Sequence, residues 1–189
     1  MPILIFRYGT MNSSKTANLL MSAHNYIATN KKIFVIKPST DKRFDINIIK
    51  SRAFSKGMIV DLIMSEEIED ISHYINNEIS CIFVDECQFL SCKNVDSLRN
   101  IKFDIPIICY GLRTDFKGKL FEGSRRLFEI ADKIEEISTE CVMCNRKAII
   151  NSKFIINGEG NREIIYDGNI SVDLGGEEKY QSVCWNCWK

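Results

Sequence analysis

The sequence predicts an α/β fold, in which a parallel sheet is covered by helices on both faces and is followed by a small metal-binding domain. Short apolar runs alternate with helix-like segments through residues 1–140. These runs are continuously apolar, which is typical of parallel strands buried on both faces. After Thr139 the pattern changes to short β-like runs, several glycines and two pairs of cysteines. We therefore place a larger domain at residues 1–140 and a smaller one at residues 141–189.

The first half of the larger domain is expected to contain three strands and one helix. Ile3–Tyr8 is an apolar run that ends at Gly9. Lys15–Ala28 has apolar residues at helical spacing and predicts a helix. Ile33–Lys37 and Met58–Ile63 are rich in β-branched residues, which favour strands.

Two helices and two strands complete the larger domain. Glu66–Asn77 has acidic residues in its first turn and isoleucines at helical spacing, so it predicts a helix. Cys81–Val84 has the pattern of a buried strand, and Ile105–Tyr110 is a second run of this kind. Gly118–Asp132 is expected to be helical.

Residues 141–189 cannot bury a large core. Their expected strands are the short runs Lys153–Ile156, Glu163–Tyr166 and Asn169–Leu174. A bound metal would supply the missing stabilisation.

Two C-x-x-C pairs could bind this metal. They are Cys141 with Cys144 and Cys184 with Cys187. Two such pairs are typical of a tetrahedral Cys₄ zinc site. Four thiolates leave no open coordination position, so the zinc would be structural. Four unrelated thiols are the alternative interpretation.

The composition argues against several classes of protein. Lys and Arg total 25, as do Asp and Glu, and the formal net charge is zero. A dedicated nucleic-acid-binding protein would usually carry a basic excess. No apolar run approaches the ~18–20 residues that span a bilayer. The N-terminus has no basic stretch ahead of its apolar run and no small-residue cleavage site, so we expect a cytoplasmic protein that binds neither nucleic acid nor membrane.

One segment has the context of a phosphate-binding P-loop, because it follows a strand and opens a helix. It is Gly9-Thr10-Met11-Asn12-Ser13-Ser14-Lys15-Thr16. Backbone N–H groups and a helix N-terminus favour an anion there. Lys15 would reach the β- and γ-phosphates, and the Thr16 hydroxyl would bind Mg²⁺. Ser14 departs from the pattern, which has glycine before the lysine. An ordinary strand–helix turn is the alternative interpretation.

Asp85 and Glu86 are adjacent carboxylates at the end of an apolar strand. In a P-loop fold, a carboxylate at this point holds Mg²⁺, usually through water. A second carboxylate could accept the proton of an attacking hydroxyl. Side chains alternate along an extended strand end, so the two can take different roles. Without the P-loop, a solvated acidic pair at a loop start would be the better interpretation.

Three phenylalanines, Phe89, Phe116 and Phe121, follow the strands that end at Val84 and Tyr110. Ligands of α/β sheets bind at the carboxyl ends of strands. Aromatic rings there could sandwich a nucleobase, and a place in the core is the other interpretation.

Together, these segments resemble the cytosolic thymidine kinases of bacteria, animals and large DNA viruses, over nearly the whole chain. The matching motifs are Val84-Asp85-Glu86-Cys87-Gln88-Phe89-Leu90, Cys109-Tyr110-Gly111-Leu112-Arg113-Thr114-Asp115-Phe116-Lys117-Gly118, Asp41-Lys42-Arg43-Phe44 and Gly175-Gly176-Glu177-Glu178-Lys179-Tyr180. The agreement around Cys109–Gly118 is most similar to the enteric-bacterial branch. The resemblance implies a RecA-like P-loop core and a C-terminal zinc ribbon that carries a substrate-binding lasso loop.

The resemblance also implies an activity, which is transfer of the ATP γ-phosphate to the 5′-hydroxyl of thymidine to give dTMP. Glu86 would be the general base, Thr16 and Asp85 would bind Mg²⁺, and Arg43 would stabilise charge near the transferred phosphoryl group. The implied ATP-binding residues are Gly9, Thr10, Met11, Asn12, Ser13, Ser14, Lys15, Thr16, Asp85, Glu86, Cys87 and Gln88. The implied thymidine-binding residues are Met11, Phe89, Leu112, Phe116, Phe121, Ser171, Val172, Asp173, Leu174, Gly175 and Tyr180.

The family further implies a homotetramer and feedback inhibition by dTTP. Two functions of other classes remain open. Ser14 would also suit a degenerate nucleotide-binding protein without activity, and the zinc ribbon would suit an adaptor that binds nucleic acid.

Overall fold

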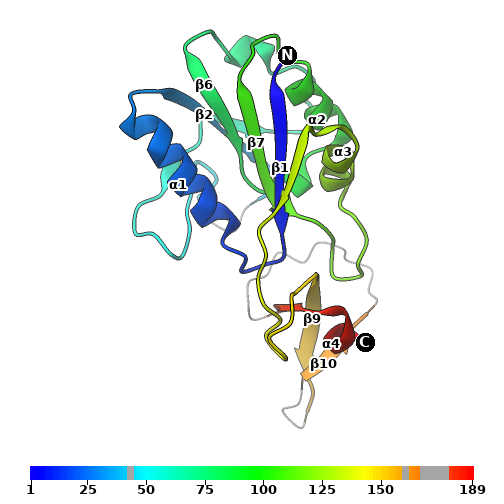
Figure 1. Ribbon diagram of the computed structural model, residues 1–189. Helices are drawn as coiled ribbons and strands as arrows, with labels where there is room; N and C mark the ends of the chain where they lie inside the picture. Colours follow the sequence, from blue (N-terminus) through cyan, green and yellow to red (C-terminus); the bar gives the residue numbers. More distant parts are fainter. Residues whose placement is uncertain (42–44, 159–161, 167–178) are drawn as a thin grey trace.

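A six-stranded parallel sheet forms the centre of the larger domain (Figure 1). The computed structural model describes residues 1–41, 45–158, 162–166 and 179–189. The sheet has the strand order β5-β2-β6-β7-β1-β8, and every neighbouring pair is parallel. Its strands are β1 (Ile3–Gly9), β2 (Lys32–Pro38), β5 (Leu62–Met64), β6 (Ile79–Val84), β7 (Pro106–Leu112) and β8 (Lys133–Glu136). The predicted parallel sheet is confirmed.

Helices cover both faces of this sheet. Helix α1 (Lys15–Ala28) packs on one face, and α2 (Cys92–Arg99) and α3 (Glu122–Ile130) pack on the other (Figure 1). The side chains of β6 show the division, because Phe83 packs in the cluster with α1 whereas Val84 packs in the cluster with α2 and α3. Burial on both faces explains why the inner strands β6 and β7 are mainly apolar.

The order of the strands positions the predicted site. Strand β7 lies between β1, which leads into the P-loop, and β6, which leads into Asp85 and Glu86. Since all three strands run in the same direction, their carboxyl ends meet at one edge of the sheet. This is the RecA-like arrangement that the resemblance implied.

The run Met58–Ile63 is not one strand, as the sequence predicted, but two. Met58–Ile59 forms β4, which pairs with β3 (Ile48–Ile49) in a separate hairpin, and β5 begins at Leu62. Between them, the Asp61 carboxylate accepts a hydrogen bond from the Val35 backbone N–H at 2.8 Å. This polar residue interrupts the apolar run, and the chain passes at this point from the β3–β4 hairpin to the central sheet.

The predicted helix over Glu66–Asn77 is wrong. The segment contains only the 3₁₀ turn η1 (Ser72–Tyr74). Asp70 and Asn76 accept hydrogen bonds from backbone N–H groups two residues further on, at 2.8 and 3.0 Å. Such turns compete with helical hydrogen bonds. The Asn94 amide also donates to the carbonyl oxygen of Ile68 at 2.7 Å, which uses an acceptor that a helix would need.

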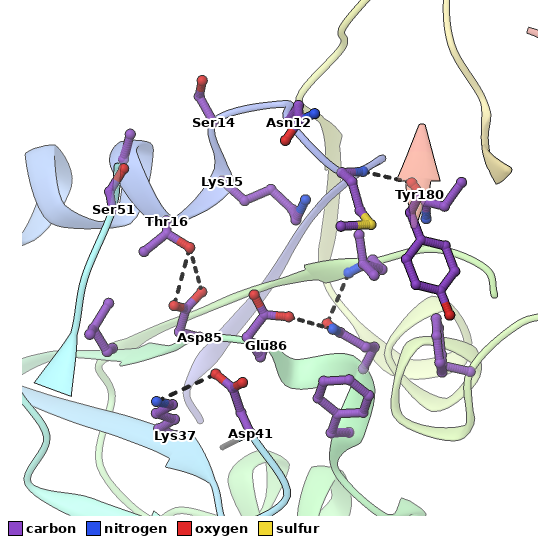
Figure 2. A pocket seen from close by; sticks show the side chains of 18 of the residues that line it. Asn12, Ser14, Lys15, Thr16, Lys37, Asp41, Ser51, Asp85, Glu86 and Tyr180 are labelled. Carbon is purple, nitrogen blue, oxygen red and sulfur yellow. Dashed lines mark hydrogen bonds and ion pairs between the residues drawn. The ribbon is translucent and has the colours of Figure 1, made fainter. Parts of the chain in front are cut away.

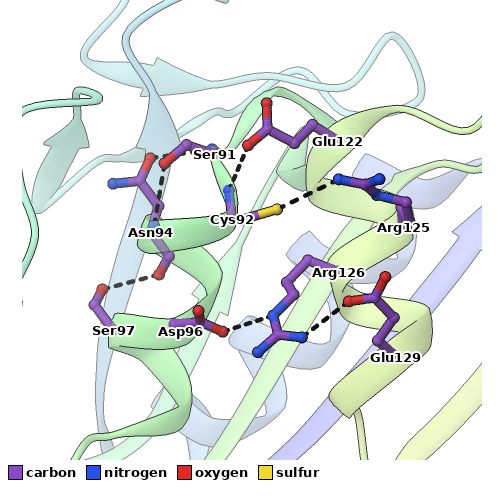
Figure 3. Close-up of polar contacts among 9 residues, drawn as sticks. All are labelled: Ser91, Cys92, Asn94, Asp96, Ser97, Glu122, Arg125, Arg126 and Glu129. Atoms are coloured by element: carbon purple, nitrogen blue, oxygen red, sulfur yellow. Dashed lines mark hydrogen bonds and ion pairs between the residues drawn. The ribbon is translucent and has the colours of Figure 1, made fainter.

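Helix α2 was not predicted, although Ser91 and Asn94 form a capping box at its start. Helix α3 begins at Glu122 and not at Gly118, because the Asp115 carboxylate holds the backbone N–H groups of Lys117 and Lys119 in a turn. Figure 3 shows the polar contacts between the two helices, which include Arg126 Nε to Asp96 Oδ1 at 2.7 Å.

The C-terminal part forms a small antiparallel sheet with the order β10-β9-β11. Its elements are β9 (Ile150–Ile156), β10 (Arg162–Ile165), β11 (Tyr180–Val183) and the short helix α4 (Trp185–Trp188). The expected strands Lys153–Ile156 and Glu163–Tyr166 fall on β9 and β10, whereas Asn169–Leu174 lies outside the described residues. None of the helices in the described part of the chain is long and apolar enough to cross a membrane.

Candidate active site

The P-loop folds tightly between the end of β1 and the start of α1. A Cβ atom on Gly9 would overlap the Ser13 hydroxyl and lie 2.5 Å from the carbonyl oxygen of Ile137, so only glycine fits. Lys15 is buried, and its Nζ donates to the Thr10 carbonyl oxygen at 2.6 Å. The loop thus holds an ammonium group at the N-terminus of a helix, which is a suitable place for phosphate.

The residue that departs from the P-loop pattern adopts a glycine-like backbone. Ser14 has φ 60° and ψ 28°, in the left-handed region. This conformation costs a residue with a Cβ atom about 1–2 kcal/mol. The Ser14 side chain is exposed and points away from Lys15 and Thr16 (Figure 2). The serine therefore keeps the shape of the loop and leaves both functional side chains in place, at a cost in stability.

We expect Ser14→Gly to raise the free energy of unfolding by about 1 kcal/mol, because glycine relieves the left-handed strain. The ratio kcat/KM for ATP should change by less than about tenfold, since the backbone already has the required conformation. Thermal melting and steady-state kinetics measure both effects. Asn30→Gly, at another left-handed position (φ 57°), is the control, because asparagine tolerates this region. If the parent is inactive and Ser14→Gly restores activity, Ser14 itself disables the loop.

Two buried carboxylates lie beside the P-loop. Asp85 and Glu86 are 5% and 7% exposed. The Thr16 hydroxyl lies 3.2 and 3.4 Å from the two oxygens of Asp85 (Figure 2). A hydroxyl and a carboxylate at this separation suit a hard cation such as Mg²⁺, which prefers oxygen ligands. The fold thus brings together the two residues that the sequence assigned to Mg²⁺.

Glu86 is held in a defined orientation by Gln88. The Gln88 amide donates to Glu86 Oε2 at 2.5 Å, and its oxygen accepts from the backbone N–H of Leu112 at 2.9 Å. Gly111 allows this close packing, because a Cβ atom there would lie 2.7 Å from Gln88 Oε1. The Glu86 backbone is also left-handed, with φ 51° and ψ 37°. Residues at functional sites often retain such strained backbones.

Aromatic and apolar side chains form a wall of the same pocket. The predicted pocket residues Met11, Phe89, Leu112, Phe116, Phe121 and Tyr180 all line it, together with Lys15, Thr16, Asp85, Glu86 and Gln88. The rings of Phe89 and Phe121 are in edge-to-face contact at 5.9 Å, and those of Phe116 and Tyr180 lie 6.4 Å apart. A planar ring could bind between such side chains.

Several predicted residues do not line this pocket with their side chains. Cys87 is fully buried in the core, where desolvation raises the pKa of its thiol well above the ordinary value. Any contact between Cys87 and ATP would therefore come from its backbone. Arg43, Ser171, Val172, Asp173, Leu174 and Gly175 lie outside the described residues.

Sequence reasoning assigned no role to Lys37, Asp41, Arg52 or Asn151, which also line the pocket. Lys37 and Asp41 form an ion pair at 3.4 Å with side chains only 3% and 4% exposed (Figure 2). Arg52 donates to the side chain of Asn12 at 2.7 Å, and Asn151 reaches the pocket from β9. Lys37 lies at the end of a predicted strand, which was the available signal. Nothing in the sequence indicated that Asn151 lies beside the P-loop.

The four cysteines of the C-terminal part converge on one point. The sulfur atoms of Cys141, Cys144, Cys184 and Cys187 all lie within 4.8 Å of one another. Cys144 and Cys184 are 3.5 Å apart, which is too far for a disulfide and close to the ~3.8 Å that separates two sulfurs around a tetrahedral zinc ion. The set can bind zinc, as the spacing predicted.

Local hydrogen bonds favour the thiolate form of two of these cysteines, Cys141 and Cys184. Desolvation raises the pKa of Cys141, but hydrogen bonds from the backbone of Cys184, Met143 and Cys144 outweigh it and lower the pKa to about 6. Backbone hydrogen bonding at Cys187 likewise lowers the pKa of Cys184. Because metal ions bind thiolates, a lowered pKa at these two cysteines favours the form that a zinc ion would bind.

Comparisons with known proteins identify the family of this chain. The sequence model of the family "Thymidine kinase" matches residues 3–188. The thymidine kinase of Streptococcus agalactiae serotype Ia is 38% identical over 186 residues, which cover 96% of this chain and 94% of the relative. The thymidine kinase of the enteric bacterium Photorhabdus laumondii is 39% identical over 188 residues, which cover 96% of this chain and 89% of the relative. The chain therefore belongs to the thymidine kinase family.

Proposed function

We propose that this protein is a thymidine kinase, which transfers the γ-phosphoryl group of ATP to the 5′-hydroxyl of thymidine and produces dTMP and ADP. The observation that carries this proposal is that Lys15, two buried carboxylates and an aromatic wall line the same pocket. Family membership supplies the identity of the substrates.

The nucleotide side of the pocket is the P-loop. Residues 9–16 would bind the phosphates through backbone N–H groups, and Lys15 would neutralise charge on the β- and γ-phosphates. Thr16 and Asp85 would hold Mg²⁺, which neutralises the charge that develops on the phosphate oxygens. The contact between Thr16 and Asp85 at 3.2 Å supports this pairing.

Glu86 would be the general base. Its carboxylate takes the proton of the thymidine 5′-hydroxyl as the 5′-oxygen forms a bond to the γ-phosphorus. The bond between that phosphorus and the bridging oxygen breaks, and ADP leaves. Gln88 supports this role because its amide holds the Glu86 carboxylate in a defined orientation within the pocket. Arg43 is proposed, from the family resemblance, to stabilise the transferred phosphoryl group.

The thymine base would bind on the opposite side of the pocket. Met11, Phe89, Leu112, Phe116, Phe121 and Tyr180 supply the apolar wall. From the family resemblance, we propose that residues 171–175, which lie outside the described residues, belong to a lasso loop whose backbone contacts the base. Strand β11 begins at Tyr180, five positions after Gly175, so this segment lies close in sequence to a residue of the apolar wall.

We further propose that residues 1–140 are the catalytic domain and that residues 141–189 are a zinc ribbon. The zinc would be structural, held by Cys141, Cys144, Cys184 and Cys187 with no position left for a substrate. From the family we also propose a cytoplasmic homotetramer that dTTP inhibits by occupying the thymidine site.

We expect the purified protein to convert thymidine to dTMP with ATP and Mg²⁺, and to reject deoxyguanosine. Fixed backbone groups that read a pyrimidine would be left unpaired by a purine, at about 1–3 kcal/mol for each group. Chromatography of the reaction products measures both reactions. Comparable phosphorylation of the two nucleosides would contradict the proposed substrate. If neither is phosphorylated and the protein retains nucleic acid, the adaptor function replaces the kinase.

A further inference from the structure

The C-terminal sheet holds the P-loop directly, through both polar groups of one residue. The backbone N–H of Met11 donates to Asn151 Oδ1 at 2.7 Å, and the Met11 carbonyl oxygen accepts from the Ser182 hydroxyl at 2.5 Å. Asn151 is 4% exposed and Ser182 is 1% exposed. Each end of the Met11 backbone is therefore paired with a buried side chain of the C-terminal sheet.

The sheet geometry explains why these two side chains reach the same residue. Asn151 on β9 and Ser182 on β11 are directly opposite each other in the antiparallel pair. Residues opposite each other point to the same face of a sheet. The pair thus forms a rigid, two-point clamp, and we call it the Met11 clamp.

The Met11 clamp is also tied to the cysteine cluster. Ser182 lies two residues before Cys184, and its carbonyl oxygen accepts from the backbone N–H of Val142 at 3.1 Å. Val142 lies between Cys141 and Cys144, the first cysteine pair. Ile149 N–H in turn donates to the Val183 carbonyl oxygen at 2.9 Å. Binding of a metal by the cysteines would therefore fix the positions of β9 and β11 beside the P-loop.

Asn151 joins a third segment to this arrangement. Its amide nitrogen donates to the carbonyl oxygen of Thr114 at 3.2 Å, in the segment that follows β7. That segment leads to Phe116, which lines the apolar wall. One side chain therefore connects the phosphate loop, the wall and the C-terminal sheet.

We infer that Asn151 and Ser182 are positioning residues. Through their hydrogen bonds to Met11, the metal-bound ribbon holds the P-loop in the conformation that binds phosphate. This inference rests on the proposed function and extends it, because the ribbon then supports the binding of ATP as well as that of thymidine. Met11 is the point of coupling, since its backbone belongs to the phosphate loop and its side chain lines the pocket.

A neighbouring residue offers a matched control. Ser152 lies next to Asn151 on β9 and is 2% exposed. Its hydroxyl is buried and has no hydrogen-bond partner among the described residues. Ser152→Ala therefore removes a hydroxyl with the same burial on the same sheet, without touching the Met11 clamp.

The test compares Asn151→Ala, Ser182→Ala and Ser152→Ala with the parent. We expect the first two variants to bind a non-hydrolysable ATP analogue about tenfold more weakly by calorimetry, because each removes the hydrogen-bond partner of a partly buried backbone group of Met11. The Michaelis constants for ATP and thymidine should rise together. Ser152→Ala should match the parent, and all variants should keep their zinc content and most of their thermal stability.

The conservative variant Ser182→Thr retains the hydroxyl, so it should restore the binding of the analogue to within about threefold of the parent. The inference is overturned if zinc-replete Asn151→Ala and Ser182→Ala bind the analogue as tightly as Ser152→Ala. The binding measurement needs no turnover, which separates the two proposals. A parent that binds the analogue but makes no dTMP contradicts the proposed function alone.

Discussion

Glu86→Gln is expected to lower the rate of dTMP formation by about 10²–10⁴, the usual contribution of a general base. The amide keeps the size and shape of the carboxylate and can still accept the hydrogen bond from Gln88, which lies 2.5 Å away in the parent. It cannot accept the proton of the 5′-hydroxyl. Binding of ATP and thymidine should therefore remain near the parent values.

Rapid-quench kinetics measures the rate of dTMP formation, and calorimetry measures the binding of ATP and thymidine by the same preparations. Glu129→Gln provides the control, because it makes the same chemical change at an ion pair with Arg126 on α3, away from the pocket. Near-normal turnover by Glu86→Gln would mean that Glu86 is not the base. Asp85, the other buried carboxylate of the pocket, would then be tested in its place.

Removal of zinc is expected to abolish thymidine binding and to weaken the binding of ATP by about tenfold or more. Structural zinc contributes ~10–16 kcal/mol to the folding of small zinc domains. In the described part of residues 141–189, the apolar cluster is small and consists of Cys141, Ile150, Val183 and Cys184 with a few partly buried neighbours. Without the metal this part of the chain should unfold, and the Met11 clamp and Tyr180 would be lost with it.

Elemental analysis should find one zinc ion per chain, and Cys141→Ser should reproduce the effect of a chelator. Cys92→Ser is the matched control, because Cys92 is a free thiol at the start of α2 that lies outside the cluster. A folded, active protein without zinc would contradict this prediction, as would a Cys141→Ser variant with unchanged affinity for thymidine.

The parts of the fold that could be predicted from sequence are those in which one local signal dominates. Helix α1 has the predicted bounds, because the P-loop fixes its start and its apolar residues recur at helical spacing. The four cysteines can be assigned as metal ligands from their spacing alone, because two C-x-x-C pairs are typical of a zinc site whatever the surrounding fold. In these places local chemistry and the global fold agree.

The errors arise where distant side chains decide the outcome. Glu66–Asn77 has a helical pattern, but Asn94 of α2 takes one of its carbonyl oxygens. The positions of Asn151 and Ser182 beside Met11 depend on how two sheets pack, and no local pattern encodes that contact. Secondary structure signals are local, whereas a binding pocket is assembled from segments far apart in the chain.

The left-handed backbones of this pocket have a consequence for laboratory evolution. Asn12, Ser14 and Glu86 all have positive φ angles, and all three line the pocket. Glycine at Ser14 or Glu86 would release strain of about 1–2 kcal/mol, and glycine at Asn12 would release less because asparagine tolerates this region. At Glu86 the same change would remove the proposed base. Selection for heat resistance alone would therefore enrich inactive descendants, so libraries of this enzyme need a screen for turnover beside the screen for survival.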